Sequence, residues 1–291
     1  MHTGVVPELP EVHALAADLD ARLRGRVVDR LDVVSFAVLK TFDPLVSALA
    51  GQTVWRVTRH GKFLDLAIGD LHLVGHLARA GWIRWRDGAP AASGRPGKGP
   101  LAARLVLDEG DGLDITEAGT KKSLALYVVT DPTLVPGIAS LGPDPLDGAF
   151  TVDVLGGILK RAGRAQIKGV LRNQGNIAGI GNAYSDEILH VAKMSPFKPA
   201  TLDEDETARL YDAIRSTLGD AIARSEGLAA SELKKEKKSG MRVHGRTGEA
   251  CPVCGDTVRE VIFADSTLQY CPTCQTGGKP LADRLLSRLV K

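Results

Sequence analysis

The chain reads Cys251-Pro252-Val253-Cys254 and, after sixteen intervening residues, Cys271-Pro272-Thr273-Cys274, and these two stretches contain all four of its cysteines. Two Cys-x-x-Cys pairs at this spacing are typical of a structural zinc site, in which four thiolates hold one ion on a β-hairpin. Protein then fills every coordination position, so the ion has none open for catalysis. Two disulfides are the alternative, which a cytoplasmic location disfavours. The stretch predicts one structural zinc ion per chain, bound by these four cysteines.

The length and charge of the chain indicate how many domains it has and what it can bind. A chain of 291 residues is long enough for about two domains, each with its own core. The formal net charge is only +2, but basic residues are dense from Lys234 to Arg246, just before the cysteines. Such a run is usually a solvated helix end, although its place beside a metal motif favours a phosphate-facing surface. Aromatic residues make up 4% of the chain, which argues against a stacking surface for single-stranded nucleic acid.

The sequence predicts neither a membrane span nor a secretory signal. No stretch approaches the roughly 18 apolar residues that a span requires. Glu8, Glu11 and Asp18 stand where a signal peptide would need an apolar core. We therefore expect a cytoplasmic protein without membrane association.

Periodicity separates a strand-rich N-terminal half from a helical part. Leucines at helical spacing predict a helix over 13–23, ending near Gly25. Gly/Asp-rich turns such as 109–112 then separate segments with the composition of strands, namely 27–34, 53–68, 71–85, 103–107 and 124–129. This succession favours a β-sandwich over alternating βαβ units. A loop is expected over 89–100, a proline-rich linker near 131–148, and mainly helix from 151 to 230.

A glycine-rich block lies between two predicted helices. It reads Gly179-Ile180-Gly181-Asn182-Ala183-Tyr184-Ser185-Asp186-Glu187, and the second helix begins near Asn182. Two glycines permit a tight turn that exposes backbone N–H groups at a helix N-terminus, where a phosphate can bind. The Asn182 amide can add a donor. Glycine and asparagine are equally favoured in an ordinary capping turn, so the block alone leaves both interpretations open.

A third block, Pro7-Glu8-Leu9-Pro10-Glu11-Val12, lies near the start of the chain. A proline that is the first residue carries a secondary amine, which can attack an aldehyde carbon and form an iminium ion. The carboxyl group of the adjacent Glu8 can transfer protons. A hexapeptide with two prolines can equally be an extended arm.

Together the three blocks resemble the formamidopyrimidine-DNA glycosylase/endonuclease VIII family, whose mature proteins begin Pro-Glu-Leu-Pro-Glu-Val. The resemblance implies that the glycine-rich block belongs to a helix–two-turn–helix DNA-binding element. Lys168 matches the conserved lysine upstream of that element, and Lys62 matches the lysine of the catalytic domain. Arg79, in a segment beginning at His76, stands where the family usually has a methionine that fills the gap left by a flipped nucleotide.

The resemblance implies an α+β multidomain fold. We expect an N-terminal catalytic β-sandwich domain over 1–135 and a linker over 136–150. A helical helix–two-turn–helix domain over 151–238, a β-hairpin zinc finger over 239–279 and a C-terminal tail over 280–291 complete the chain.

The implied function is that of a bifunctional DNA glycosylase/AP lyase in base excision repair. Pro7, Glu8 and Lys62 are the expected catalytic residues. Arg79, Lys168 and Asn182 are the expected DNA-binding residues. The implied partner is double-stranded DNA with damaged bases or abasic sites, bound by a monomer that associates with the nucleoid during repair.

The chain departs from the family pattern at several places. Residues 1–6 precede Pro7, so either they are removed or translation begins at Val6. The family's Arg-Arg-Phe-Gly loop is replaced by the sequence over 117–122, and Ser266 replaces the usual arginine of the zinc hairpin. The loop that caps flipped 8-oxoguanine in some members is expected to be missing, because Lys238 leads quickly into the zinc finger.

Two alternatives come from other functional classes. A DNA-damage-binding protein without lyase activity would retain residues 1–6, which block the Pro7 amine. A zinc-ribbon transcription or translation factor would explain the cysteines but neither the Pro7 block nor the Asn182 block.

Overall fold

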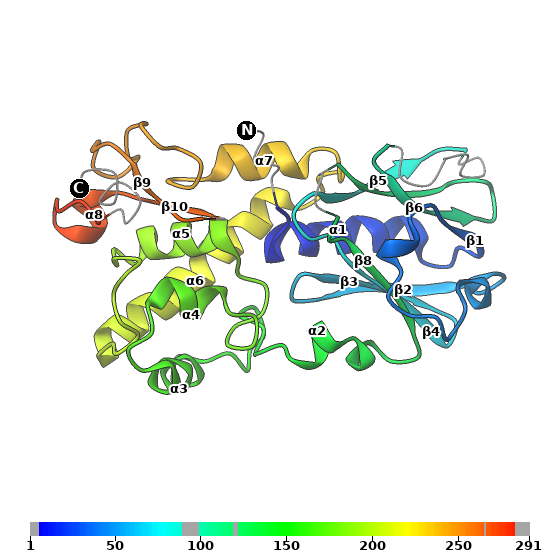
Figure 1. Ribbon diagram of the computed structural model, residues 1–291, viewed down its shortest axis with the longest axis horizontal. Helices are drawn as coiled ribbons and strands as arrows, with labels where there is room; N and C mark the ends of the chain where they lie inside the picture. The colour runs from blue at the N-terminus through cyan, green and yellow to red at the C-terminus, as the bar shows by residue number, and fades with distance from the viewer. Residues whose placement is uncertain (1–5, 89–98, 119–121, 265, 283–291) are drawn as a thin grey trace. The chain divides into compact units, whose positions relative to one another are not determined.

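The computed structural model describes residues 6–88, 99–118, 122–264 and 266–282 (Figure 1). The chain divides into two compact units. The first comprises Met1–Ser140 together with Arg224–Glu236, and the second comprises Leu141–Ala223 together with Lys237–Lys291. Residues 89–98 of the predicted loop and 283–291 of the predicted tail lie outside the described residues.

The first unit begins with helix α1 (Leu9–Leu23). Its leucines recur every four residues at Leu15, Leu19 and Leu23, and all three are buried. Gly25, with φ of 82°, ends the helical segment in the left-handed conformation that glycine adopts without steric cost. The apolar face of α1 packs against strand β2 (Val54–His60), which fixes the helix to the core.

Two antiparallel four-stranded sheets form the body of this unit. One has the strand order β1-β6-β7-β5 and the other β2-β3-β4-β8, which confirms the predicted β-sandwich. The strands are β1 (Val28–Val33), β2 (Val54–His60), β3 (Phe63–Ile68), β4 (Leu71–His76), β5 (Gly81–Arg86), β6 (Leu101–Leu107), β7 (Gly112–Glu117) and β8 (Ala125–Val129). Short helical turns lie between β1 and β2, η1 (Phe36–Val38) and η2 (Val46–Leu49), and after β8, η3 (Pro132–Leu134) and α2 (Pro136–Ala139).

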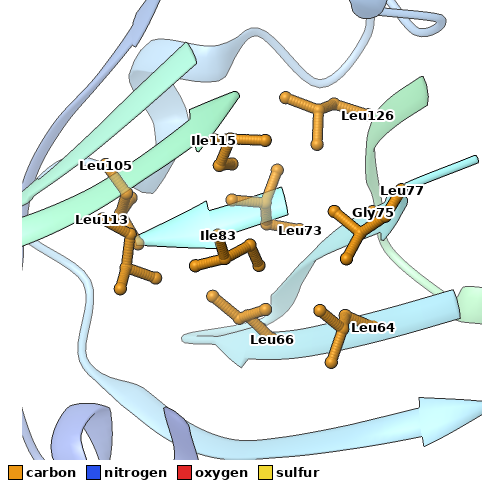
Figure 2. A pocket seen from close by; sticks show the side chains of 10 residues that line it. All are labelled: Leu64, Leu66, Leu73, Gly75, Leu77, Ile83, Leu105, Leu113, Ile115 and Leu126. Atoms are coloured by element: carbon orange, nitrogen blue, oxygen red, sulfur yellow. The ribbon is translucent and has the colours of Figure 1, made fainter. Parts of the chain in front are cut away.

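The sandwich interior is apolar. Figure 2 shows leucine and isoleucine side chains from both sheets around a cavity of about 20 Å³. Its lining includes Leu64, Leu73 and Leu113 and contains no charged side chain. An apolar void of this size is a packing defect of the core and has no group to orient a polar ligand.

Strand β7 was missing from the sequence prediction. The segment after Gly112 carries acidic residues that interrupt the apolar pattern, yet Asp114 is only 3% exposed. Arg104 donates to Asp114 across the sheet, with Nε to Oδ1 at 2.6 Å, and Arg86 donates to Oδ2 at 2.8 Å. A carboxylate that is paired in this way can be buried, so Asp114 is compatible with a strand inside the sheet.

The segment Arg224–Glu236 returns to the first unit, whereas the expected boundaries group it with the helical domain. The Trp82 Nε1–H group donates to the Ala230 carbonyl at 3.1 Å, and the Lys234 ammonium lies 4.3 Å from the centre of the Trp82 ring. Leu233 is fully buried in the sandwich core. These contacts make Arg224–Glu236 part of the first unit, although this segment is distant from the sheets in sequence.

The second unit is helical with a terminal hairpin, as predicted. Its elements are α3 (Val152–Ala162), α4 (Ile167–Arg172), α5 (Asn182–Val191), α6 (Glu204–Ser225), α7 (Leu233–Gly240), β9 (Arg259–Ile262), β10 (Thr267–Tyr270) and α8 (Pro272–Thr276), of which α6 and α7 extend across the unit boundary. Strands β9 and β10 pair antiparallel. Among the described residues, no helix combines the length and apolar character of a membrane span.

Candidate functional site

A capping box fixes the carboxylate beside Pro7. Glu8 is the N-cap of α1, and its backbone N–H donates to Glu11 Oε2 at 2.8 Å while its own side chain faces the Glu11 N–H. Glu8 and Glu11 are 2% and 1% exposed. The reciprocal bonds satisfy donors that a helix N-terminus otherwise leaves unpaired, and they hold the Glu8 side chain in one position. The sequence motif thus starts the helix and holds a buried carboxylate next to the proline.

Lys62 lies at the tip of the β2–β3 hairpin, which divides the strand-like segment 53–68 into two strands. Gly61, with φ of 55°, makes the tight turn that precedes it. Burial and the nearby Lys62 charge lower the pKa of His76 to about 4. The His76 ring contacts the Phe63 ring at a tilt of 49°, with centroids 4.6 Å apart. A neutral imidazole and an ammonium group therefore lie near one end of the β2–β3–β4 strands, and sequence reasoning had not selected His76.

Arg79 is exposed on a tight turn between β4 and β5. Ala78 has φ of 53°, and the Gly81 N–H donates to the Leu77 carbonyl at 2.8 Å. A Cβ atom at Gly81 would lie 2.1 Å from that oxygen, so only glycine fits. The turn presents the Arg79 side chain at its apex.

Glu117 closes the loop that replaces the family's Arg-Arg-Phe-Gly segment. Its Oε1 accepts from the Ser123 and Leu124 N–H groups at 2.6 and 2.9 Å, and the Lys122 ammonium donates to its carbonyl at 2.6 Å. Residues 119–121 of this loop lie outside the described residues. The two ends of the loop are therefore held together by one buried carboxylate.

Glycines shape the turn before α5. Gly179 has φ of 87°, and Gly181 is the N-cap residue of α5. Gln174 braces the turn: its Oε1 accepts from the Gly179 N–H at 2.9 Å, and its Nε2 donates to the Ile180 carbonyl at 2.7 Å. Asn182, the first helical residue, donates from Nδ2 to the Thr267 carbonyl at 2.8 Å. Sequence reasoning identified the glycines and Asn182 but not Gln174, whose bracing bonds depend on the folded turn.

Lys168 lies inside the second unit. Its ammonium donates to Asp186 Oδ1 at 2.6 Å, to Ser185 Oγ at 2.7 Å and to the Asn182 carbonyl at 3.1 Å. Its side chain is 7% exposed. In this structure Lys168 therefore stabilises the first turn of α5 from within, and its expected role in DNA binding stays a prediction.

The four cysteine sulfurs lie within 4.8 Å of one another and form no disulfide. Cys254 Sγ lies 3.3 Å from Cys271 Sγ, and Cys251 Sγ lies 3.9 Å from Cys274 Sγ. Tetrahedral zinc with Zn–S bonds of about 2.3 Å separates its sulfurs by about 3.8 Å, which fits these distances. Burial raises the pKa of the Cys271 thiol to about 11, so its thiolate form requires a cation nearby. The predicted single structural zinc site is confirmed.

Two polar side chains outside the predicted set join this hairpin to α5. His190 is 2% exposed and its Nε2 lies 3.3 Å from Cys251 Sγ. The Glu187 carboxylate accepts from the backbone N–H groups of Arg242, Val243 and His244 at 2.7–2.9 Å. A lone histidine on a helix carries no local sign of such a partner, which explains why the sequence did not reveal it.

Ser266, at the position of the missing hairpin arginine, lies in the β9–β10 turn, where its carbonyl accepts from the Phe263 N–H at 2.8 Å. Asp265 lies outside the described residues. Helix α7 ends at Gly240 and the next residues lead directly into the zinc segment, so no long loop separates the two.

Three family models match successive parts of the chain. Residues 6–122 match the formamidopyrimidine-DNA glycosylase N-terminal domain, 141–232 the formamidopyrimidine-DNA glycosylase H2TH domain, and 248–277 the zinc finger found in FPG and IleRS.

Individual relatives show the same likeness. A Mycobacterium tuberculosis protein described as an uncharacterized formamidopyrimidine-DNA glycosylase-like protein is 59% identical over 54% of this chain and 98% of its own length. The formamidopyrimidine-DNA glycosylase of Symbiobacterium thermophilum is 33% identical over 93% of this chain and 89% of its own. Lactococcus lactis Fpg, solved in complex with DNA containing an abasic site, superposes with a TM-score of 0.80 at 27% identity, covering 92% of this chain and 99% of that one.

Proposed function

The chain belongs to the formamidopyrimidine-DNA glycosylase family of DNA repair, and from this we propose that it is a bifunctional DNA glycosylase and abasic-site lyase. The observation that carries the proposal is the capping box, which holds the Glu8 carboxylate beside Pro7. An acid–base group fixed next to an amine is the pair that nucleophilic amine catalysis requires.

In the proposed reaction the lone pair of the Pro7 amine attacks C1′ of the damaged nucleotide. The glycosidic C1′–N bond breaks and the base leaves with a proton supplied through Glu8. Opening of the sugar gives an iminium ion, which makes the neighbouring C–H protons acidic. Removal of these protons drives successive eliminations that expel the phosphates on both sides of the sugar. Water then hydrolyses the iminium, which frees the Pro7 amine and releases the remnant of the sugar as an unsaturated aldehyde. The products are the free base, this sugar fragment and a strand broken on both sides of the lost nucleotide.

Lys62 assists this chemistry in the proposal. A nearby ammonium disfavours the protonated form of an amine, so more of the Pro7 amine is neutral and nucleophilic. The Lys62 charge already acts on His76, whose pKa it helps to lower. Lys62 can also bind a phosphate beside the lesion.

Double-stranded DNA is the proposed partner. The N-terminus of α5, with the second N–H of the Asn182 amide, is the proposed phosphate-binding site. Exposed Arg79 enters the space left by a flipped nucleotide. Flipping costs a few kcal/mol, and least at damaged or mispaired bases, which supplies part of the selectivity. Lys168 acts through Asn182 by holding the first turn of α5.

The experiment combines base release with covalent trapping on lesion-bearing duplexes. We expect free base, strand breaks and, under borohydride, a protein–DNA adduct. Binding to abasic DNA with neither strand cleavage nor an adduct would instead identify a damage-binding protein.

A Lys168→Met variant tests the internal role of this lysine. The change removes the Lys168 ammonium from the buried Asp186, which is still bonded to His244 Nδ1, and breaking a buried ion pair costs about 3–5 kcal/mol. We expect the free energy of unfolding and the DNA affinity to fall together. Exposed Lys160, also in the second unit, provides the control Lys160→Met, which should change neither. Normal stability with a salt dependence of DNA binding reduced by about one charge would show that Lys168 contacts phosphate directly.

The structure also favours a particular lesion preference. We expect poor excision of 8-oxoguanine paired with cytosine, compared with cleavage at abasic sites or excision of ring-opened or oxidised pyrimidines. Telling 8-oxoguanine from guanine requires donors to the few atoms that differ, and α7 leads into the zinc segment without a capping loop. Ser266 is too short to grip phosphates as an arginine does. Kinetics on matched duplexes check this, and a clear preference for 8-oxoguanine would contradict it.

A further inference from the structure

One face of α5 is hydrogen-bonded to the zinc hairpin along its length. Asn182, Asp186 and His190 are four residues apart, so they lie on the same side of the helix. Asn182 Nδ2 donates to the Thr267 carbonyl at 2.8 Å, and Asp186 Oδ2 accepts from the Gln269 N–H at 3.2 Å. Both partners belong to β10, which lies beside α5 (Figure 1).

The same row continues to the cysteines. His190 Nε2 lies 3.3 Å from Cys251 Sγ, and both residues are buried. Beyond the end of the helix, the Met194 carbonyl accepts from Gln275 Nε2 at 2.9 Å, within α8 and directly after the fourth ligand. The helix therefore contacts the hairpin at β10 near one end and at the cysteines near the other.

The zinc site determines which atom is the donor in the bond between His190 and Cys251. A zinc-bound cysteine is a thiolate and has no proton to donate, so the Nε2 atom must carry the hydrogen. His190 Nδ1 is buried and has no hydrogen-bond partner, which suits a nitrogen that carries no proton. An N–H group donating to a thiolate is a charge-assisted bond and belongs to the stronger class.

We propose that His190 is a positioning residue that donates to the Cys251 thiolate and thereby couples zinc binding to the conformation of the Asn182 turn. Zinc fixes Cys251, Cys251 fixes His190, and the rigid helix transmits this constraint to its own N-terminus. The consequence for DNA affinity rests on the proposed phosphate-binding role of Asn182, whereas the coupling itself does not.

The experiment compares His190→Leu with His190→Gln in the full chain. Leucine keeps an apolar volume but removes the donor, whereas glutamine retains an N–H group near the Nε2 position. Loss of an outer-shell partner typically weakens metal binding by 10–100-fold. We expect that loss for leucine in competition with a zinc-selective chelator, and near-normal affinity for glutamine.

The second readout is hydrogen exchange of the backbone amides in 179–183, measured without DNA. Removing zinc from the unchanged protein should increase exchange there, with α3 as the internal reference. His190→Leu should reduce this response to zinc, and His190→Gln should restore it. Equal zinc affinity in the leucine variant, or an unchanged turn after zinc removal, would overturn the proposal. Because neither readout involves DNA, failure of the proposed enzymatic function would leave both results interpretable.

Discussion

A chain that begins with Pro7 is expected to become covalently attached to abasic-site DNA under borohydride, whereas a chain that retains residues 1–6 should give no adduct. An amide-bonded proline nitrogen has no available lone pair, so only the free secondary amine can form an iminium ion. Residues 1–5 lie outside the described residues. The capping bonds of Glu8 lie within 8–11 and do not require the preceding residues, so the acid–base group is expected to keep its position in both forms.

The matched variant is Pro7→Gly in the chain that begins at residue 7. It leaves a primary amine in place of the secondary one and should weaken trapping without changing binding to abasic DNA. Gel separation of the adduct and a binding assay in parallel distinguish the two effects. Equal trapping of the extended and trimmed forms would rule out Pro7 as the nucleophile.

The second large effect is expected at the zinc site. Cys271→Ser should remove the bound zinc, unfold the hairpin and lower DNA affinity, while the β-sandwich stays folded. Cys271 is fully buried, and its sulfur also caps α8 by accepting from the Cys274 N–H at 3.5 Å. Structural zinc contributes about 10–16 kcal/mol of apparent binding free energy in small zinc domains, so its loss outweighs the local packing.

Metal analysis gives the zinc content, and limited proteolysis reports which part of the chain has opened. Val253→Ser is the control, because Val253 lies between two ligands and is 58% exposed. It should retain one zinc per chain and normal protease resistance. Protein prepared without chelator that nonetheless contains no zinc would contradict the prediction.

Local patterns predicted the parts of this protein whose partners are close in sequence or whose spacing is itself diagnostic. The cysteine spacing, the leucines of α1 and the glycines before α5 are of this kind. The features that the sequence did not reveal depend on distant partners. Lys168 pairs with Asp186 eighteen residues away, so its burial has no local signature. His190 meets a cysteine sixty-one residues away, and β7 buries an acidic residue whose arginine partner is on another strand.

The return of Arg224–Glu236 to the first unit limits how this protein can be divided. A fragment that stops at Ser140 would contain both sheets but lack Leu233 and leave the Trp82 N–H without its acceptor. Such a fragment is expected to aggregate when expressed alone, because apolar core surface would become exposed. A fragment that carries residues 224–236 on a short linker after Ser140 restores the missing piece. Topologically both units are discontinuous, because the chain enters the second unit at Leu141, returns to the first at Arg224 and enters the second again at Lys237.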